Sequence, residues 1–104
     1  GQGDVNDGLS VALAHAVNEW QLAHWVDHEP RLRGSIVVAY EDGAAAAAEI
    51  RKRAGDRRFC QVLLMSRTSE PLGRQRYWPI WEAAAEVGLP VGIHAFGFSP
   101  ACVC

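Results

Sequence analysis

One histidine stands where a side chain could do chemistry. His94 follows the short apolar run of residues 90–93, which we expect to be a strand. A neutral imidazole binds Zn²⁺ and similar ions, and it can transfer protons near neutral pH. A single histidine makes a weak metal site, so a histidine that is hydrogen-bonded at a strand end is the competing interpretation.

The other histidines offer weaker signals. His24 and His28 are four residues apart, so on one helix they would share a face. That spacing can bind a metal ion, but two solvated side chains are the simpler interpretation. His15 has no partner at a useful spacing, and we expect it on the surface.

The cysteines do not indicate a disulfide framework, because there are only three of them. Cys60 lies inside an apolar run, and we expect it to be a small core residue. Cys102 and Cys104 could bind a soft metal or oxidise, although a frayed tail explains them more simply. Sparse cysteines favour a cytoplasmic setting.

Helix and strand patterns alternate three times along the chain, and these elements must position the side chains above. Leu13, Val17 and Trp20 recur at helical spacing in the first segment, which Asp7 can cap and Pro30 ends. The later helices are bounded by Asp42, Gly55, Pro79 and Gly88. We expect helices at about residues 9–27, 42–53 and 79–87, and strands near 34–39, 60–65 and 90–95.

This alternation predicts an α/β fold whose three strands are parallel and in sequential order. All three strands are apolar on both faces, as strands are when both faces are covered. The three helices would lie on one face, so something else must cover the other. We expect Ile36, Val38, Val62 and Ile93 to face the helices, and Val37, Leu63 and Met65 to face away from them.

Composition limits the class of protein. The 104 residues make one domain at most, 49% of them are hydrophobic, and the net charge is -2. Without a basic excess, nucleic acid is not an expected partner, and no apolar run approaches the ~20 residues of a membrane span. We expect an N-terminal tail at residues 1–8 that is not a secretory signal, one domain at 9–98 and a second tail at 99–104.

Three segments carry a family likeness. The stretch RYWPIWEAAAEVGLPVGIH (residues 76–94) resembles a helix and the following strand of the amidohydrolase-related family. The stretch DHEPRLRGSIVV (residues 27–38) and residues 46–64 resemble the same family. The likeness is to the branch that contains aminocarboxymuconate semialdehyde decarboxylase and similar metal-dependent hydrolases and carboxy-lyases, and it covers roughly residues 9–98.

The resemblance implies a metal-dependent hydrolase or decarboxylase on a (β/α)₈ barrel of ~250 residues. This chain would be a partial TIM-barrel-like (β/α) fragment, with three parallel strands alternating with three helices. The family places a metal-binding histidine at the position of His94, which implies Zn²⁺ or another divalent metal there. We recognise none of the other family ligands, so we expect no bound metal and no full catalytic activity in the isolated chain.

The resemblance also places the substrate at the strand ends. Arg67 is the arginine nearest the end of the second strand, and arginine holds carboxylates with two parallel hydrogen bonds. We therefore predict that Arg67 contacts a small carboxylate ligand, with an ordinary solvated loop as the alternative. Two other organisations stay open: a non-catalytic module that self-associates, and one half of a split barrel that another chain completes. The bare strand face favours a homodimer or higher oligomer.

Overall fold

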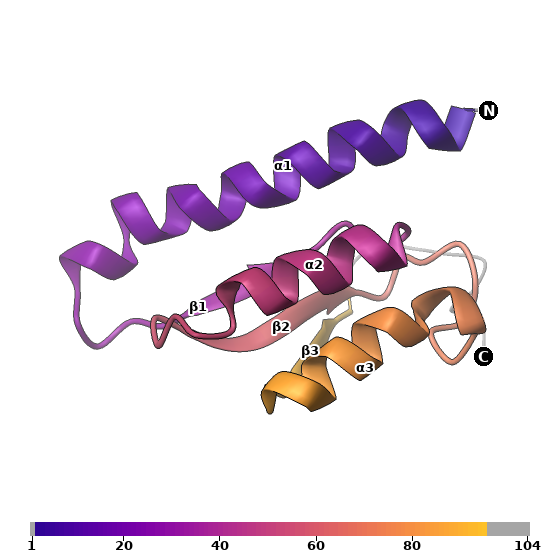
Figure 1. Cartoon of the computed structure of the whole chain (residues 1–104). Helices are drawn as coiled ribbons and strands as arrows, with labels where there is room; N and C mark the ends of the chain where they lie inside the picture. The colour runs from indigo at the N-terminus through magenta and orange to yellow at the C-terminus, as the bar shows by residue number, and fades with distance from the viewer. Residues whose placement is uncertain (1, 96–104) are drawn as a thin grey trace.

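Three parallel strands form one sheet in the order β1-β2-β3, as the alternating pattern predicts (Figure 1). The computed structural model describes residues 2–95, with side chains from residue 8 onward. The strands lie within one or two residues of the predicted ranges, so the α/β fold class is confirmed. The elements are α1 (Gln2–His24), a 3-10 turn (Val26–His28), β1 (Gly34–Val37), α2 (Gly43–Arg53), β2 (Phe59–Met65), a second 3-10 turn (Gln75–Tyr77), α3 (Trp78–Val87) and β3 (Val91–His94).

The ends of α2 and α3 follow the local signals in the sequence. The Asp42 carboxylate accepts a hydrogen bond of 3.0 Å from the Ala45 N–H, which caps the first turn of α2. Pro79 lies in the first turn of α3, where its missing N–H costs nothing. Gly88 ends α3 with φ of 74°, in the left-handed region that glycine adopts without strain.

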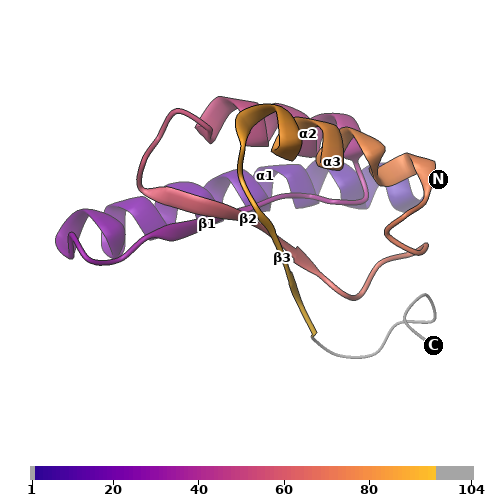
Figure 2. The same cartoon turned by 90° about the horizontal axis from the view of Figure 1, so that it is seen from below.

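The helices α2 and α3 cover one face of the sheet and build the core (Figure 2). Ile36, Val62 and Leu64 project from the sheet into this layer and are fully buried against Ile50 and Ile80. Each such side chain contributes roughly 1.5–3 kcal/mol of burial free energy. The predicted inward direction of Ile36, Val38 and Val62 is therefore confirmed.

The opposite face of the sheet is only partly covered. Val37, Leu63 and Met65 alternate with the core residues and so face away from the helices, as predicted, and they are half-buried. Ile93 also shares the row of the buried Leu64, in the direction predicted, but it is 52% exposed. The helix layer ends before the last residues of β3, so this edge strand is less covered than β2.

The first helix does not join the other two, which corrects the expectation that all three helices lie on one face. α1 runs beyond the outer edge of β1, outside the layer that α2 and α3 form (Figures 1 and 2). The Asn18 amide donates to the Val37 carbonyl and accepts from the Val37 N–H, both at 2.8 Å. The Gln21 amide donates to the Ser35 carbonyl at 2.8 Å. These side chains make the hydrogen bonds that a neighbouring strand would make with β1.

Some side chains lie elsewhere than expected. α1 begins at Gln2, so Asp7 lies inside the helix rather than at its cap. Cys60 is exposed, not a core residue, and it lies where the pairing of β1 and β2 is irregular, between Phe59 and Gln61. Trp20 and Trp25 are also largely exposed. Among the described residues, no helix combines the length and apolar character that crossing a membrane requires.

Candidate functional site

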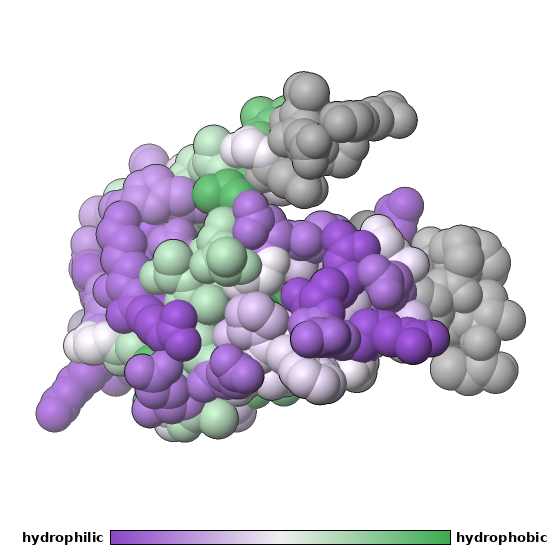
Figure 3. Space-filling view, turned by 45° about the vertical axis from the view of Figure 1, so that its right-hand side comes forward, coloured by the Kyte–Doolittle hydropathy of each residue, from purple (hydrophilic) through white to green (hydrophobic). Residues whose placement is uncertain are grey.

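A cavity of about 560 Å³ opens where β1 and β2 end. This volume is within the range of small-molecule sites. Its walls come from three places: one side of α1, the end of β1 with the loop that follows it, and the loop after β2. In the space-filling view, hydrophilic residues gather below a notch in the surface on this side of the molecule (Figure 3). The lining residues are Ser10, Leu13, Ala14, Val17, residues 37–42, Arg67, Ser69 and Arg76.

Arg67 is one of these lining residues, so its predicted position at a strand-end site agrees with the structure. Its carbonyl oxygen accepts a hydrogen bond of 2.9 Å from the Tyr40 hydroxyl, which anchors the backbone. Within residues 8–95, the Arg67 guanidinium makes no hydrogen bond or ion pair. Burial raises the pKa of Tyr40, and the nearby positive charge of Arg67 opposes that rise. A charged group with an open hydrogen-bonding fork is thus available to a ligand.

Arg76 lines the same cavity, but its charge is already paired. Its guanidinium lies 2.7 Å from the Glu70 carboxylate and 3.2 Å from that of Glu41. The hydrogen bond to Glu70 raises the pKa of Arg76 above its usual value. Tyr77 is fully buried, and its hydroxyl donates to the Glu41 carboxylate at 2.9 Å. This network joins the loops after β1 and β2, so Arg76 holds the site together while Arg67 faces it.

Close packing and two indoles fix the loop after β2 against the helices. A Cβ at Gly43 would lie 2.6 Å from the Arg76 carbonyl oxygen, so the start of α2 can approach this loop only with glycine there. The indole N–H of Trp81 donates to the Leu72 carbonyl at 2.9 Å, and that of Trp78 donates to the Gly73 carbonyl. The loop that carries Arg67 is thereby tied to the body of the molecule.

His94 is the last residue of β3 and pairs in register with Met65 of β2. It is exposed at the carboxyl end of its strand, where we expected it, and its carbonyl accepts from the Ser66 N–H at 3.0 Å. It does not line the cavity that Arg67 lines. The structure therefore places both predicted residues at the same end of the sheet without joining them in one pocket.

The residues present do not fit a catalytic metal ion by themselves. Within the described part of the chain, no three His, Cys, Asp or Glu side chains come close enough to hold one. His24 ends α1 while His28 belongs to the following 3-10 turn, so they do not share a helical face. Cys102 and Cys104 lie outside the described residues. His94 would supply one ligand, and Zn²⁺ catalysis takes three from the protein.

The family model described as Amidohydrolase matches residues 2–103, almost the whole chain. The chain belongs to the amidohydrolase family. No curated protein matches it at a significant level. The three parallel strands and three helices of this amidohydrolase chain are consistent with part of a (β/α) barrel, which has its sites at the carboxyl ends of the strands.

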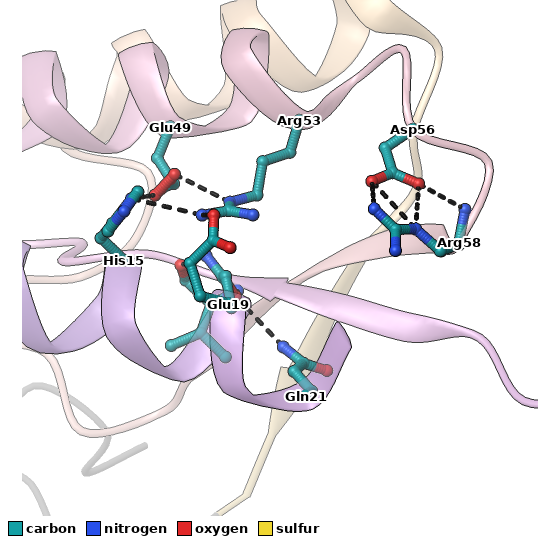
Figure 4. Close-up of polar contacts among 9 residues, drawn as sticks. His15, Glu19, Gln21, Glu49, Arg53, Asp56 and Arg58 are labelled. Carbon is teal, nitrogen blue, oxygen red and sulfur yellow. Dashed lines mark hydrogen bonds and ion pairs between the residues drawn. The ribbon is translucent and has the colours of Figure 1, made fainter. Parts of the chain in front are cut away.

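The structure of this amidohydrolase chain contains a second polar cluster, which the sequence did not reveal. Arg53 is 5% exposed, and its guanidinium contacts Glu49 at 2.9 Å and Glu19 of α1 at 3.0 Å (Figure 4). It also lies 3.2 Å from His15 Nδ1, so His15, whose side chain is 46% exposed and at the surface as expected, has a charged partner there. The hydrogen bond from Arg53 lowers the pKa of Glu19. The cluster fastens α1 to α2, and the cation also lies 5.7 Å above the Phe59 ring.

Proposed function

We propose that this chain contributes a substrate-binding part of a metal-dependent amidohydrolase-family site, in which Arg67 holds the carboxylate of a small substrate. One observation carries the proposal: Arg67 lines the cavity at the strand ends, and its guanidinium is unpaired within the described residues. Hydrolysis or decarboxylation of a small or cyclic carboxylate, as in the branch that contains aminocarboxymuconate semialdehyde decarboxylase, is the reaction we favour. We place this activity in the cytoplasm because the chain has few cysteines.

His94 would be one metal ligand in this scheme, and Zn²⁺ or another divalent ion would polarise a substrate oxygen or a bound water. At least one of the other ligands would have to come from outside residues 8–95, because these residues hold no group of three. We therefore propose that the isolated chain lacks full activity and binds metal weakly. A second polypeptide that supplies the other strands would complete such a site.

Carboxylate binding can be tested without catalysis. Titrating the chain with acetate and benzoate, followed by amide chemical shifts, should move the residues around Arg67. Arg67→Gln should weaken binding by about ten-fold, since a hydrogen bond to a charged group is worth roughly 1.5–3 kcal/mol. Arg74→Gln is the matched control, because Arg74 is exposed in the same loop and does not line the cavity. Equal binding of the carboxylates by both variants would show that Arg67 does not contribute to the binding site.

The metal part of the proposal has a separate test. Purified chain should carry less than about a tenth of an equivalent of zinc or manganese, because one histidine is a weak site. A full equivalent of tightly held metal would mean that ligands beyond His94 are present in this chain. Co-purification from the native host then tests for the completing chain, and isolation of the chain alone would count against a split enzyme.

A non-catalytic, self-associating module is the second candidate, and exposed apolar side chains favour it. Leu9, Leu13, Val17 and Trp20 of α1 are all more than two-fifths exposed, and Val37 and Leu63 are half-buried on the sheet. A homodimer that covers them should bury more than ~2,000 Å² in total. Light scattering at micromolar concentration should find a mass well above 11.4 kDa. A folded species at the monomer mass would contradict this candidate.

A further inference from the structure

The direction of α1 along β1 gives the strand-end cavity two different ends. Asn18 contacts Val37, and three residues later Gln21 contacts Ser35, so the helix and the strand run in opposite directions. Positions earlier in α1 therefore lie beside positions later in β1 and in its following loop. Val17 and Val37, beside the Asn18–Val37 contact, therefore line one end of the cavity, and the loop that carries Arg67 lines the other.

The lining is apolar at the end beside Val17 and polar near the loops. Val17 and Val37 lie next to the Asn18 contact, and Leu13 follows one helical turn further along. Ser10 lies at the end where Tyr40 and the loop after β2 meet the cavity. The seven helical steps from Ser10 to Val17 span about 10 Å. A ligand that fills the cavity thus needs an apolar body and one polar end.

The charged residues in the lining indicate which chemical group the ligand carries at its polar end. Two carboxylates, those of Glu41 and Asp42, line the cavity but are engaged: Glu41 by Arg76 and Tyr77, and Asp42 by the Ala45 N–H. Arg67 is the cation that remains for a ligand among the described lining residues. No lining residue next to Val17 carries a charge, so a second carboxylate at that end would find no charged partner in the lining.

We propose that this cavity binds a medium-chain aliphatic monocarboxylate of about eight carbons, a length that matches the helical span of about 10 Å. The carboxylate pairs with Arg67, and the chain lies along Leu13, Val17 and Val37. This proposal rests on the proposed function only in that Arg67 holds a carboxylate. Binding covers Leu13 and Val17, which are 55% and 43% exposed in the free chain.

Titration calorimetry of the 104-residue chain with butyrate, octanoate and 1-octanol, each below its micellar concentration, tests the proposal. Octanoate should bind at least about ten-fold more tightly than butyrate, since each buried methylene contributes up to about four-fold. Arg67→Gln should weaken octanoate binding by about ten-fold and leave octanol unchanged. Leu13→Ser should weaken octanoate by about five-fold, whereas Leu9→Ser should not, because Leu9 is as exposed on α1 but does not line the cavity.

The outcomes separate the two proposals. If butyrate and octanoate bind equally and Arg67→Gln weakens both, the carboxylate site stands and the medium-chain ligand is overturned. If octanol binds as well as octanoate and Arg67→Gln changes neither, both proposals fail, because the cavity then takes only an apolar ligand. If Leu13→Ser and Leu9→Ser behave alike, the ligand lies outside this cavity. Circular dichroism of each variant confirms that it is folded, which is expected because both leucines are exposed.

Discussion

The helices on the face of the sheet, α2 and α3, and the helix at its edge, α1, are held by different interactions. α2 and α3 bury Ile50, Ile80 and Ala83 completely against the strands. α1 buries a fully enclosed asparagine, Asn18, in its contact with β1 while it exposes large apolar residues such as Trp20. One side is held by apolar burial, and the other combines the burial of Ala14 and Leu22 with directional polar contacts.

This difference indicates which part of the molecule can rearrange. Burial of a large apolar side chain contributes roughly 1.5–3 kcal/mol, whereas the net contribution of one hydrogen bond is about 1 kcal/mol. The layer of α2, α3 and the strands should therefore form the stable unit. α1 should open at lower free energy, and the cavity between it and β1 is where a ligand or a partner chain could add apolar contacts.

The largest expected effect is in the core under α2. Ile50→Ala should lower the free energy of unfolding by about 2–5 kcal/mol, because a fully buried side chain is replaced by a cavity. Leu9→Ala on α1 should change it by less than about 0.5 kcal/mol, since Leu9 is 61% exposed. Urea denaturation of the two variants provides the measurement. Similar losses would mean that α1 is packed as firmly as α2.

An intermediate effect is expected where α1 meets β1. Asn18→Ala removes both hydrogen bonds to Val37 and should cost about 1–3 kcal/mol, because it leaves the strand's N–H and C=O without these partners. Gln21→Ala removes one bond to the Ser35 carbonyl and should cost less. Amide hydrogen exchange should show faster exchange at Val37 in Asn18→Ala alone. Unchanged protection of the Val37 amide would contradict the role of Asn18 as the hydrogen-bonding partner of the β1 edge.

A smaller effect should appear on acidification, through the contact between α1 and α2. The hydrogen bond from Arg53 holds the pKa of Glu19 below its usual value of 4.5 in the folded chain. Folding is therefore favoured above pH 4.5, and this contribution is lost as the pH falls through the lower pKa of the folded state. Glu19→Gln should show a smaller drop in melting temperature between pH 6 and pH 3 than the wild type. An equal drop would mean that other carboxylates account for the acid sensitivity.

The core side of the molecule was predictable because its signals are local. Short apolar runs located the strands, and Asp42 and Gly88 marked helix ends through bonds to residues nearby in the chain. The position of Arg67 beyond the end of β2 followed from the same strand pattern, whereas its role as a substrate contact came from the family resemblance and stays a prediction.

The α1 side was not predictable because its contacts are distant in sequence. Arg53 reaches Glu19 and His15 across 34 and 38 residues, and no spacing rule connects them. Asn18 sits in a helical pattern whose apolar residues suggested the buried face, yet the structure buries the asparagine instead. The sequence offered one sign of this arrangement, a polar residue among the apolar residues of the helix. Its burial is explained only by the open edge of β1, which needs hydrogen-bonding partners.

The smallest expected effect is at His94, which lies at the end of β3 where the helix layer no longer covers the sheet. The side chain is exposed, so His94→Ala creates no core cavity, and the backbone bond from the Ser66 N–H to the His94 carbonyl is retained. We expect a change in unfolding free energy within about 0.5 kcal/mol. Leu64→Ala, in the neighbouring strand but fully buried, is the matched comparison and should cost about 2–5 kcal/mol. Thermal unfolding of the two variants measures both. A loss of 2 kcal/mol or more in His94→Ala, about the cost of a core truncation, would mean that the histidine stabilises the sheet, and a packing role would then replace the metal-binding role that we propose for it.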